Sequence, residues 1–491
     1  MADQRINIAG FINLVKIGEG GNSEVYSGIR NSDRKDVVIK VKLNKDGDQN
    51  FSKKLRNSIY GLKEYDIGNT FDCDFIAKYI SYNSTPKYIY TVMEHEQGSM
   101  TVYKKDIILP FQEKISILKK LLVGLHNCHE NGIIHLDMKF ENVLMRSRKR
   151  KSMFVDEPLI TDFGFSVRVR NVKAGTYIGY GFGTYGYLAP EHYSFHYKEE
   201  DRREKYIYRG SADIWAFGVI AYRLILGKRL YPLNISTDEE IYNMMVEKFK
   251  NGDIVSLLES ADSDSFNDLS REDRDDVVEL LSRTLSWNYK ERYNTRQLLN
   301  LPIFVKSVKV DFECPLNTQR RFAIRPNSAA IPVATGLIDG IASLIPTAPV
   351  IVYYHAVDMI YRIFSISPFS SYTKEKDIVP VIISCMVISC DYNNYKRIDI
   401  FEQYLKEHNI KESEIIRLII TIANKLSYTI ARPYLLESAT SVSDIEEHIS
   451  TIIKQPREYV KERDIFYPNT DNELTPDDLR ISKLRIGDVI R

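Results

Sequence analysis

The sequence lacks the features that mark a secreted or nucleic-acid-binding protein. Five cysteines in 491 residues are scattered and odd in number, so neither a disulfide framework nor a metal-ligand spacing is visible. The 67 lysines and arginines are balanced by 66 acidic residues, which excludes a strong field for nucleic acid or an anionic membrane. These absences predict an intracellular, cytoplasmic globular protein with reduced thiols.

Long hydrophobic runs are also missing. The most apolar window, about residues 331–354, contains Asp339 and three prolines. A helix that spans a bilayer needs about 20 apolar residues without such interruptions. The N-terminus MADQRINIAGF has no basic start leading into an apolar stretch, so no secretory signal is expected. We therefore predict no contact with membranes.

The chain is too long for one compact core, and its pattern changes along its length. Before Pro110, alternating β-branched segments predict strands, with one helical run near residues 54–69. After Pro110, apolar residues recur at helical spacing. A β-rich lobe followed by a helical lobe places an expected active site in the cleft between them. The basic run 146–151 is predicted to be a solvated loop between two strands.

Beyond residue 305 the pattern changes again. Residues 306–332 have no periodicity and contain Pro, Asn and Arg, which predicts a linker. Residues 333–445 carry only helical patterns, each about as long as an ordinary globular helix. Residues 446–491 are charged and contain proline, and we predict a poorly packed tail there.

Two glycines near the N-terminus, Gly18 and Gly20 in IGEGGNSEVY, can let backbone amides approach phosphates, because no side chain shields those amides. Alone the motif is weak, since a Gly-rich hairpin turn is as common. Lys40 in VVIKVKL shares one strand face with Lys42, so alternation leaves both lysines open as a phosphate contact. The order of the pattern selects Lys40, with Glu64 as the carboxylate that would hold it.

The stretch GIIHLDMKFENVLM, residues 132–145, sets polar side chains at fixed offsets after a histidine. Asp137 can accept the proton of an attacking hydroxyl, and Lys139 can neutralise charge on a transferred phosphoryl group. Asn142 can ligate a metal through its amide oxygen. Asp162 in ITDFGFS adds a carboxylate for Mg²⁺, which prefers few protein oxygens together with phosphate oxygens.

Three further residues are expected to support the site. Glu191 ends GTYGYLAPEH, and a buried glutamate needs a partner, for which Arg292 in WNYKERYNTRQLL is available. Asp213 in SADIW is expected to brace the loop that carries Asp137 from beneath.

These elements occur in one order: Gly-rich loop, strand Lys, helix Glu, Asp/Lys/Asn loop, Asp-Phe-Gly and Ala-Pro-Glu. In that order residues 1–305 resemble the eukaryotic protein kinase family. The resemblance implies an α+β, bilobal protein kinase fold with a β-rich N-terminal lobe and a helical C-terminal lobe. It implies transfer of the γ-phosphoryl group of ATP to Ser or Thr hydroxyls of protein substrates. Mg²⁺, with Mn²⁺ as an alternative, is the implied metal.

The resemblance also implies a role for each matching residue. Asp137 and Lys139 would be catalytic, and Asn142 and Asp162 would hold the metal. Lys139, with Thr184 ahead of Ala-Pro-Glu, is similar to the serine/threonine branch of the family. The residues expected at the ATP site are Ile17, Gly18, Gly20, Val25, Lys40, Glu64, Met93 (the back of the adenine pocket) and Glu94 (the start of the hinge). Structural roles are implied for Glu191, Asp213 and Arg292.

Leu136 departs from the family pattern, which carries an arginine between the histidine and Asp137. In the family that arginine grips a phosphate on the activation segment, and leucine has no donor for this purpose. Because the phosphoryl-transfer groups are all present, we interpret the change as regulatory rather than as decay. Phosphorylation of the segment hydroxyls, such as Ser166, Thr176 and Tyr177, is therefore expected to matter little.

Residues 333–445 resemble a single cyclin box through their helix order and a few positions, although Asp391 replaces a usual lysine. The chain then looks like a kinase–cyclin fusion of the kind found in large DNA viruses. Contact with the helix that bears Glu64 would hold Lys40 and Glu64 together. A helical bundle of unrelated ancestry is the alternative.

Two other functions stay open at this point. One is a pseudokinase scaffold that binds nucleotide and docks partners through its helical domain. The other is an enzyme whose acceptor is the hydroxyl of a small molecule or lipid. The complete set of charged groups argues against the first, and Lys139 with Thr184 argues against the second.

Overall fold

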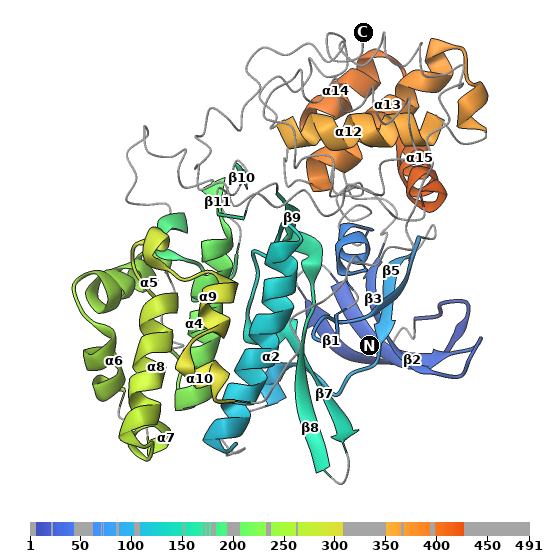
Figure 1. Ribbon diagram of the computed structural model, residues 1–491. Helices are drawn as coiled ribbons and strands as arrows, with labels where there is room; N and C mark the ends of the chain where they lie inside the picture. Colours follow the sequence, from blue (N-terminus) through green and yellow to red (C-terminus); the bar gives the residue numbers. More distant parts are fainter. Residues whose placement is uncertain are drawn as a thin grey trace, which may run out of the picture. The chain divides into compact units, whose positions relative to one another are not determined.

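A computed structural model describes the chain at residues 6–20, 23–43, 62–69, 71, 73–84, 88–102, 109–150, 153–169, 172–173, 176–177, 183–193, 207–231, 237–261, 264–307, 350–364, 368–392 and 398–426 (Figure 1). The chain divides into two compact units. The first unit combines Met1–Asn69, Tyr79–His95 and Asn317–Arg491, and the second combines Thr70–Lys78 and Glu96–Leu316. The predicted tail and nearly all of the predicted linker lie outside the described residues.

Alternating β-branched residues form a five-stranded antiparallel sheet in the first unit. In spatial order its strands are Phe11–Gly20 (β1), Ser23–Arg30 (β2), Asp36–Leu43 (β3), Tyr88–Glu94 (β5) and Tyr79–Ser84 (β4). Val37, Ile39 and Val41 face one side of β3 and pack into a core with Tyr90 and Val92. The same alternation turns Lys40 to the opposite face.

The glycine-rich motif lies at the turn of the β1–β2 hairpin, between the two strands that the sequence predicted. Strand β1 continues through the motif, and Gly18 and Gly20 pair with Val25 and Ser23 of β2. Glycine can adopt the extended backbone of a strand, although this costs conformational entropy. Because of this pairing, most of the motif belongs to the sheet. Residues 21 and 22, which connect the two strands, lie outside the described residues.

A short helix in the same unit occupies residues 62–68, within the helical run predicted at 54–69. Residues 54–61 lie outside the described part of the chain. Every side chain from Leu62 to Gly68 is buried, including the charged Lys63, Glu64 and Asp66. A helix that is buried on all sides has packing partners on more than one face.

The second unit is built mainly from helices, as the helical spacing after Pro110 predicted. Phe111–Glu130 (α2) begins after Pro110 and ends before Gly132, whose φ of 66° is the left-handed conformation that stops a helix. Gly210–Leu226 (α4) ends in the same way at Gly227. The other helices are Asp238–Met245 (α5), Ile254–Ser260 (α6), Asp264–Asn267 (α7), Arg271–Thr284 (α8), Thr295–Leu299 (α9) and Pro302–Val305 (α10).

The described residues of the second unit also form three two-stranded sheets. Ile133–Ile134 (β6) pairs with Val167–Arg168 (β9), Val143–Arg150 (β7) with Met153–Ile160 (β8), and Thr176–Tyr177 (β10) with Ile207–Tyr208 (β11).

The β7–β8 hairpin corrects the prediction of a solvated loop at residues 146–151. Residues 146–150 belong to β7, and residue 151 lies outside the described part of the chain. Arg146 faces Glu157 across the hairpin, and its Nη2 donates to the buried Glu157 carboxylate at 3.1 Å. The basic run therefore starts with a cross-strand ion pair, a contact that sequence spacing alone does not reveal.

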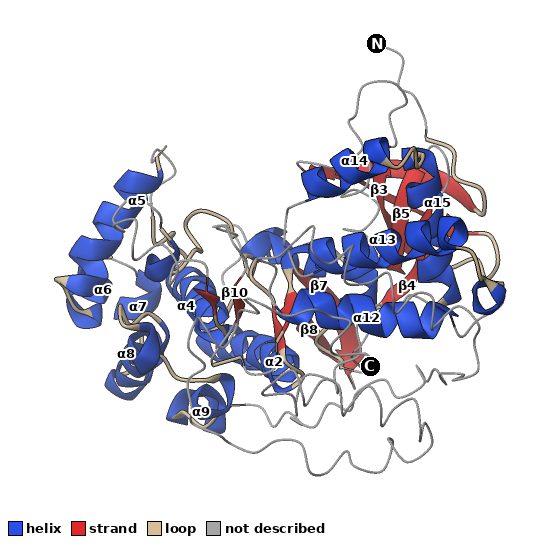
Figure 2. Ribbon diagram, turned by 90° about the horizontal axis from the view of Figure 1, so that it is seen from above, coloured by secondary structure: helices blue, strands red, loops and turns tan. Residues whose placement is uncertain are grey.

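Four helices predicted after residue 333 are present, and they belong to the first unit (Figure 2). They are Val350–Phe364 (α12), Glu375–Tyr392 (α13), Ile398–Glu407 (α14) and Glu412–Lys425 (α15). The other three helices all contact α13, whose residues from Val381 to Cys390 are buried on every side. Among the described helices, none combines the length and apolarity needed to cross a membrane.

Candidate active site

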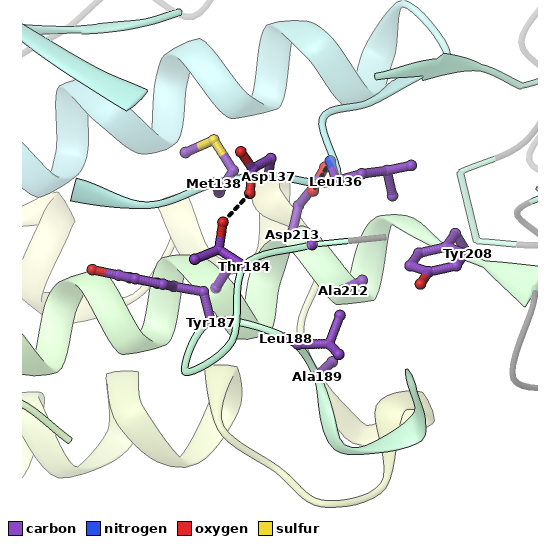
Figure 3. Close-up of a pocket in the computed structure, with 12 residues that line it drawn as sticks. Leu136, Asp137, Met138, Thr184, Tyr187, Leu188, Ala189, Tyr208, Ala212 and Asp213 are labelled. Atoms are coloured by element: carbon purple, nitrogen blue, oxygen red, sulfur yellow. Dashed lines mark hydrogen bonds between the residues drawn. The ribbon is translucent and has the colours of Figure 1, made fainter. Parts of the chain in front are cut away.

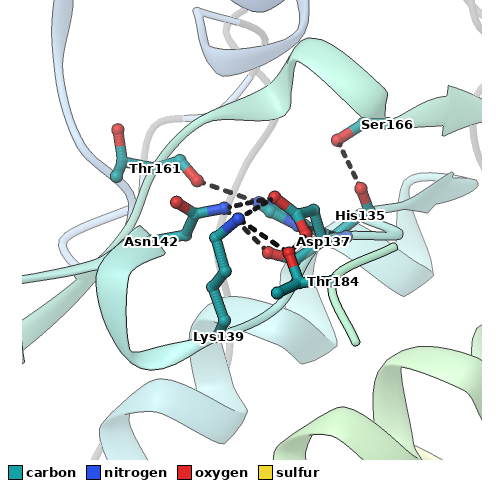
Figure 4. Close-up of polar contacts among 7 residues, drawn as sticks. All are labelled: His135, Asp137, Lys139, Asn142, Thr161, Ser166 and Thr184. Carbon is teal, nitrogen blue, oxygen red and sulfur yellow. Dashed lines mark hydrogen bonds and ion pairs between the residues drawn. The ribbon is translucent and has the colours of Figure 1, made fainter. Parts of the chain in front are cut away.

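The loop after β6 gathers the polar residues of GIIHLDMKFENVLM around one carboxylate (Figure 4). Oδ2 of Asp137 accepts hydrogen bonds from Lys139 Nζ at 2.6 Å and from Asn142 Nδ2 at 2.9 Å. Oδ1 accepts a bond of 2.6 Å from the hydroxyl of Thr184, which itself accepts from Lys139 at 2.8 Å. Charge-assisted bonds of this length hold both oxygens of a carboxylate in place. Asp137 is thus oriented by three side chains.

Asp213 holds this loop from the first turn of α4. Its two carboxylate oxygens accept the backbone N–H groups of His135 at 2.8 Å and Leu136 at 2.9 Å. A ring nitrogen of His129 lies 2.9 Å from the same carboxylate. Leu136 has a φ of 69°, and these two bonds offset the cost of that left-handed backbone. The brace expected from SADIW is present.

The segment that carries Asp162 is joined to the loop through His135. A ring nitrogen of His135 lies 3.0 Å from the Thr161 carbonyl oxygen, and Ser166 donates its hydroxyl to the His135 carbonyl at 3.2 Å. The ring of Phe163 is buried against His135, with 5.1 Å between centroids. Asp162 itself has a φ of 64°, an uncommon conformation that is concentrated at functional sites.

The orientation of the Asn142 amide bears on its predicted role as a metal ligand. Its amide nitrogen donates both to the Asp137 carboxylate and to the Asp137 carbonyl at 2.8 Å, so its amide oxygen points to the other side (Figure 4). The backbone N–H of Thr161 donates to the Asn142 carbonyl at 3.0 Å, which ties the chain just before Asp162 to this loop. One amide oxygen and one carboxylate form the sparse oxygen set that suits Mg²⁺ bound to phosphates. The side chains of Asn142 and Asp162 therefore fit a Mg²⁺ ion.

Lys40 and Glu64 form an ion pair in the first unit. Lys40 Nζ lies 3.0 Å from Glu64 Oε2, and the side chains are 16% and 2% exposed. The hydroxyl of Tyr79 donates to the other oxygen of Glu64 at 3.2 Å. The structure thus places Lys40, the lysine selected by the order of the pattern, against the expected carboxylate. Tyr79 is a partner that the sequence did not indicate.

The other residues assigned to nucleotide binding lie on the same sheet. Gly18 pairs with Val25, and Val25 pairs with Lys40. These three residues are therefore neighbours across adjacent strands, although they are separated in the sequence. Met93 is buried opposite Val38 in β5. Ile17 and Glu94 are exposed. The boundary between the two units falls between His95 and Glu96, within the predicted hinge.

Glu191 and Arg292 form the predicted pair with two parallel bonds. Nη1 and Nη2 of Arg292 each donate to one Glu191 oxygen at 2.8 Å, and the guanidinium also lies over the Trp215 ring at 4.9 Å. Burial alone would raise the pKa of the Glu191 carboxyl, but the charge and hydrogen bonds of Arg292 outweigh it and hold that pKa below its ordinary value. A bidentate pair with a buried guanidinium and a half-buried carboxylate depends on both partners.

Leu136 lies in a small apolar cluster that sequence reasoning missed. Its side chain is buried with those of Ile134, Val167, Val169 and Tyr208. Val167 and Val169 come from the start of the segment between Asp162 and Glu191, and the Val169 N–H also donates to the Gly132 carbonyl at 2.7 Å. Leucine therefore gives this segment an apolar contact where the family pattern has a cation. An apolar residue in a motif of polar ones is the signal that could have revealed this cluster.

A small pocket opens beside Asp137 (Figure 3). Its lining comes from four places in the second unit, namely the Asp137 loop, the segment before Glu191, β11 and the first turns of α4. The lining residues are Leu136, Asp137, Met138, Gly183, Thr184, Tyr187, Leu188, Ala189, Tyr208, Ala212, Asp213 and Ala216. The lining mixes apolar side chains with the carboxylates of Asp137 and Asp213 and the hydroxyl of Thr184.

Comparison with known proteins agrees with this geometry. The family model described as protein kinase domain matches residues 11–304. The serine/threonine-protein kinase shk1/pak1 of Schizosaccharomyces pombe is 27% identical over 308 residues, which cover 62% of this chain and 40% of the relative. Calcium-dependent protein kinase 5 of Plasmodium berghei is 28% identical over 297 residues, covering 59% and 45%. The chain spans less than half the length of these relatives.

The dual specificity protein kinase TTK of Mus musculus is 25% identical over 292 residues, covering 59% of this chain and 31% of the relative. The family match starts at the first strand of the sheet and ends within α10, so it includes both the Lys40–Glu64 pair and the Asp137 loop. It covers well over half of the chain, and the chain therefore belongs to the protein kinase family.

Proposed function

We propose that this protein is an active serine/threonine protein kinase that transfers the γ-phosphoryl group of ATP to protein hydroxyls. The observation that carries the proposal is the set of bonds around Asp137, whose two oxygens are held by Lys139, Asn142 and Thr184. A general base must be oriented before it can accept a proton in the transition state. A scaffold without catalysis has no need for such an arrangement.

Each residue then has a chemical role. Asp137 orients the substrate hydroxyl and accepts its proton, while the cation of Lys139 offsets negative charge that develops beside it. Asn142 and Asp162 would hold Mg²⁺, and Lys40, kept in place by Glu64, would contact the phosphates. Bound magnesium–ATP supplies the phosphoryl group and an electrophilic phosphorus. The protein contributes mainly position and fixed charge.

Protein substrates are favoured over small acceptors by the link between Asp137 and the segment before Glu191. Thr184 in that segment donates its hydroxyl to Asp137, and Leu188 of the same segment lines the pocket beside it. An extended peptide has both a hydroxyl for Asp137 and a neighbouring side chain for the pocket. The serine/threonine-protein kinases to which the chain is similar support the same acceptor class.

Asp137→Asn is the test of this function. The substitution keeps the size of the side chain but removes the base, and general-base catalysis contributes about 10²–10⁴-fold to rate. We expect transfer of labelled phosphate to a Ser/Thr peptide library to fall by at least about 100-fold in the variant, with nucleotide binding retained. If the unmodified protein binds nucleotide and transfers no phosphate, the scaffold alternative replaces this proposal.

We further propose the domain limits 1–305 for the kinase domain and 333–445 for a regulatory helical domain. Helices α12 to α15 support the second domain. The cyclin-box resemblance of this region rests on sequence alone, since the family match ends at residue 304. It stays a prediction, as does activation of the kinase by its own C-terminal domain.

A further inference from the structure

The helix at residues 62–68 is contacted from two sides by parts of the chain that are distant in sequence. On one side, Glu64 pairs with Lys40 of the sheet. On the other, the hydroxyl of Tyr392, at the end of α13, donates to Asp66 Oδ2 at 2.7 Å. Residues two positions apart on a helix with about 3.6 residues per turn point in nearly opposite directions. Glu64 and Asp66 therefore carry independent contacts to the sheet and to the C-terminal helices.

The contact with Tyr392 is buried and charged. Asp66 and Tyr392 are both 0% exposed, and Lys63 is 1% exposed with its Nζ 6.0 Å from the centre of the Tyr392 ring. A hydrogen bond to a buried carboxylate is worth more than one between neutral groups, and the cation adds attraction to the ring face. Charged groups such as Asp66 and Lys63 are costly to bury without partners. This surface of the helix therefore needs a partner that supplies polar contacts.

The tyrosine is held rigidly within its own domain. Tyr392 packs edge-on against the ring of His355 in α12, with 5.7 Å between centroids, and both residues are fully buried. Since α12 and α13 pack against each other, the position of the Tyr392 hydroxyl is fixed by its own domain. A fixed donor can restrain the short helix that accepts its bond.

We propose that the C-terminal helical domain positions Glu64 for Lys40 by docking Tyr392 onto Asp66 and Lys63, so that the kinase active site is completed in cis. The inference rests on the proposed kinase function and identifies its regulatory contact. Tyr392, Asp66 and Lys63 are positioning residues, since they act through the helix and not on the substrate. The partner for this surface of the helix is the α12–α13 pair of the same chain.

The test compares Tyr392→Phe with Tyr404→Phe in the full chain. The first variant removes only the hydroxyl that reaches Asp66. The control makes the same chemical change at a ring of α14 that stacks on His408, the residue after the end of that helix. Hydrogen exchange at residues 62–69 without nucleotide reports on the helix, and steady-state kinetics report on catalysis.

For Tyr392→Phe we expect hydrogen exchange at residues 62–69 to become roughly tenfold faster and kcat to fall roughly tenfold. Both effects follow because a hydrogen bond to a charged group is lost. The KM for peptide should stay unchanged, since peptide contacts lie at the Asp137 pocket. The control should match the unmodified protein. Unchanged exchange, or faster exchange with unchanged or higher kcat, would overturn the proposal. If the unmodified protein transfers no phosphate, the proposed function fails, and the exchange comparison alone decides whether Tyr392 restrains the helix.

A double-mutant cycle adds a second criterion. Asp66→Ala and Tyr392→Phe should each lower kcat, and the double variant should lose little more than Asp66→Ala alone, because both changes break one contact. Losses that multiply would show that the two residues act separately and would refute the inference. Circular dichroism on each variant checks that the fold is retained.

Discussion

The hydroxyl of Thr184 lies 2.6 Å from the carboxylate of Asp137, although 47 positions separate the two residues. This bond joins the segment before Glu191 to the loop that carries the proposed base. It also completes a triangle with Lys139, which donates to both residues. The position of the base thus depends on the conformation of a segment that is distant in sequence.

Thr184→Ala is expected to lower kcat by about 10- to 100-fold, because a hydrogen bond to a charged group contributes about 1.5–3 kcal/mol. Thr184→Ser keeps the hydroxyl and should retain most of the activity. Steady-state kinetics with a peptide substrate would measure both variants. Equal activity in the alanine and serine variants would show that the bond to Asp137 has no role in turnover.

Leu136→Ala is expected to destabilise the protein by about 2–4 kcal/mol, since it removes a buried side chain from the cluster with Val167 and Val169. Leu136→Met preserves the volume and should cost less than about 1.5 kcal/mol. Urea unfolding, followed by fluorescence, compares the two. A loss of stability in the methionine variant as large as that in the alanine variant would contradict the packing role.

Acid should weaken the Glu191–Arg292 pair. Because the pKa of Glu191 is held below its ordinary value, the folded state binds this proton less readily than the unfolded state. The pair's contribution is complete at pH values above the ordinary glutamate pKa of about 4.3 and is lost as the pH falls through the lower folded value. Stability therefore decreases with falling pH in that window.

Glu191→Gln provides the comparison for this pH dependence. The variant leaves Arg292 without its charged partner and should lose about 3–5 kcal/mol at pH 7. Urea unfolding between pH 7 and pH 3 should show the difference from the unmodified protein shrinking on the acid side. A difference that stays constant across this range would mean that the Glu191 charge does not contribute.

Local patterns in the chain were sufficient for the secondary structure around the motifs. Period-2 alternation located the strand that carries Lys40, and helical spacing located α12 to α15. Local pattern was insufficient for the basic run, where Arg146 belongs to β7 because Glu157 faces it across the hairpin. Cross-strand partners depend on register, and register is not visible in one strand.

The amino-acid sequence by itself predicted which side chains are candidates for phosphoryl transfer, because each motif is short and its spacing follows from local chain geometry. It also determined that Leu136 cannot bind a phosphate. Only the tertiary structure decided where Leu136 packs and what contacts the helix of Glu64, since Leu136 packs on Val167 and Val169, and Tyr392 reaches Asp66 across 326 positions. Contacts of that kind arise when surfaces pack together, and burial, unlike motif spacing, is a property of the whole fold.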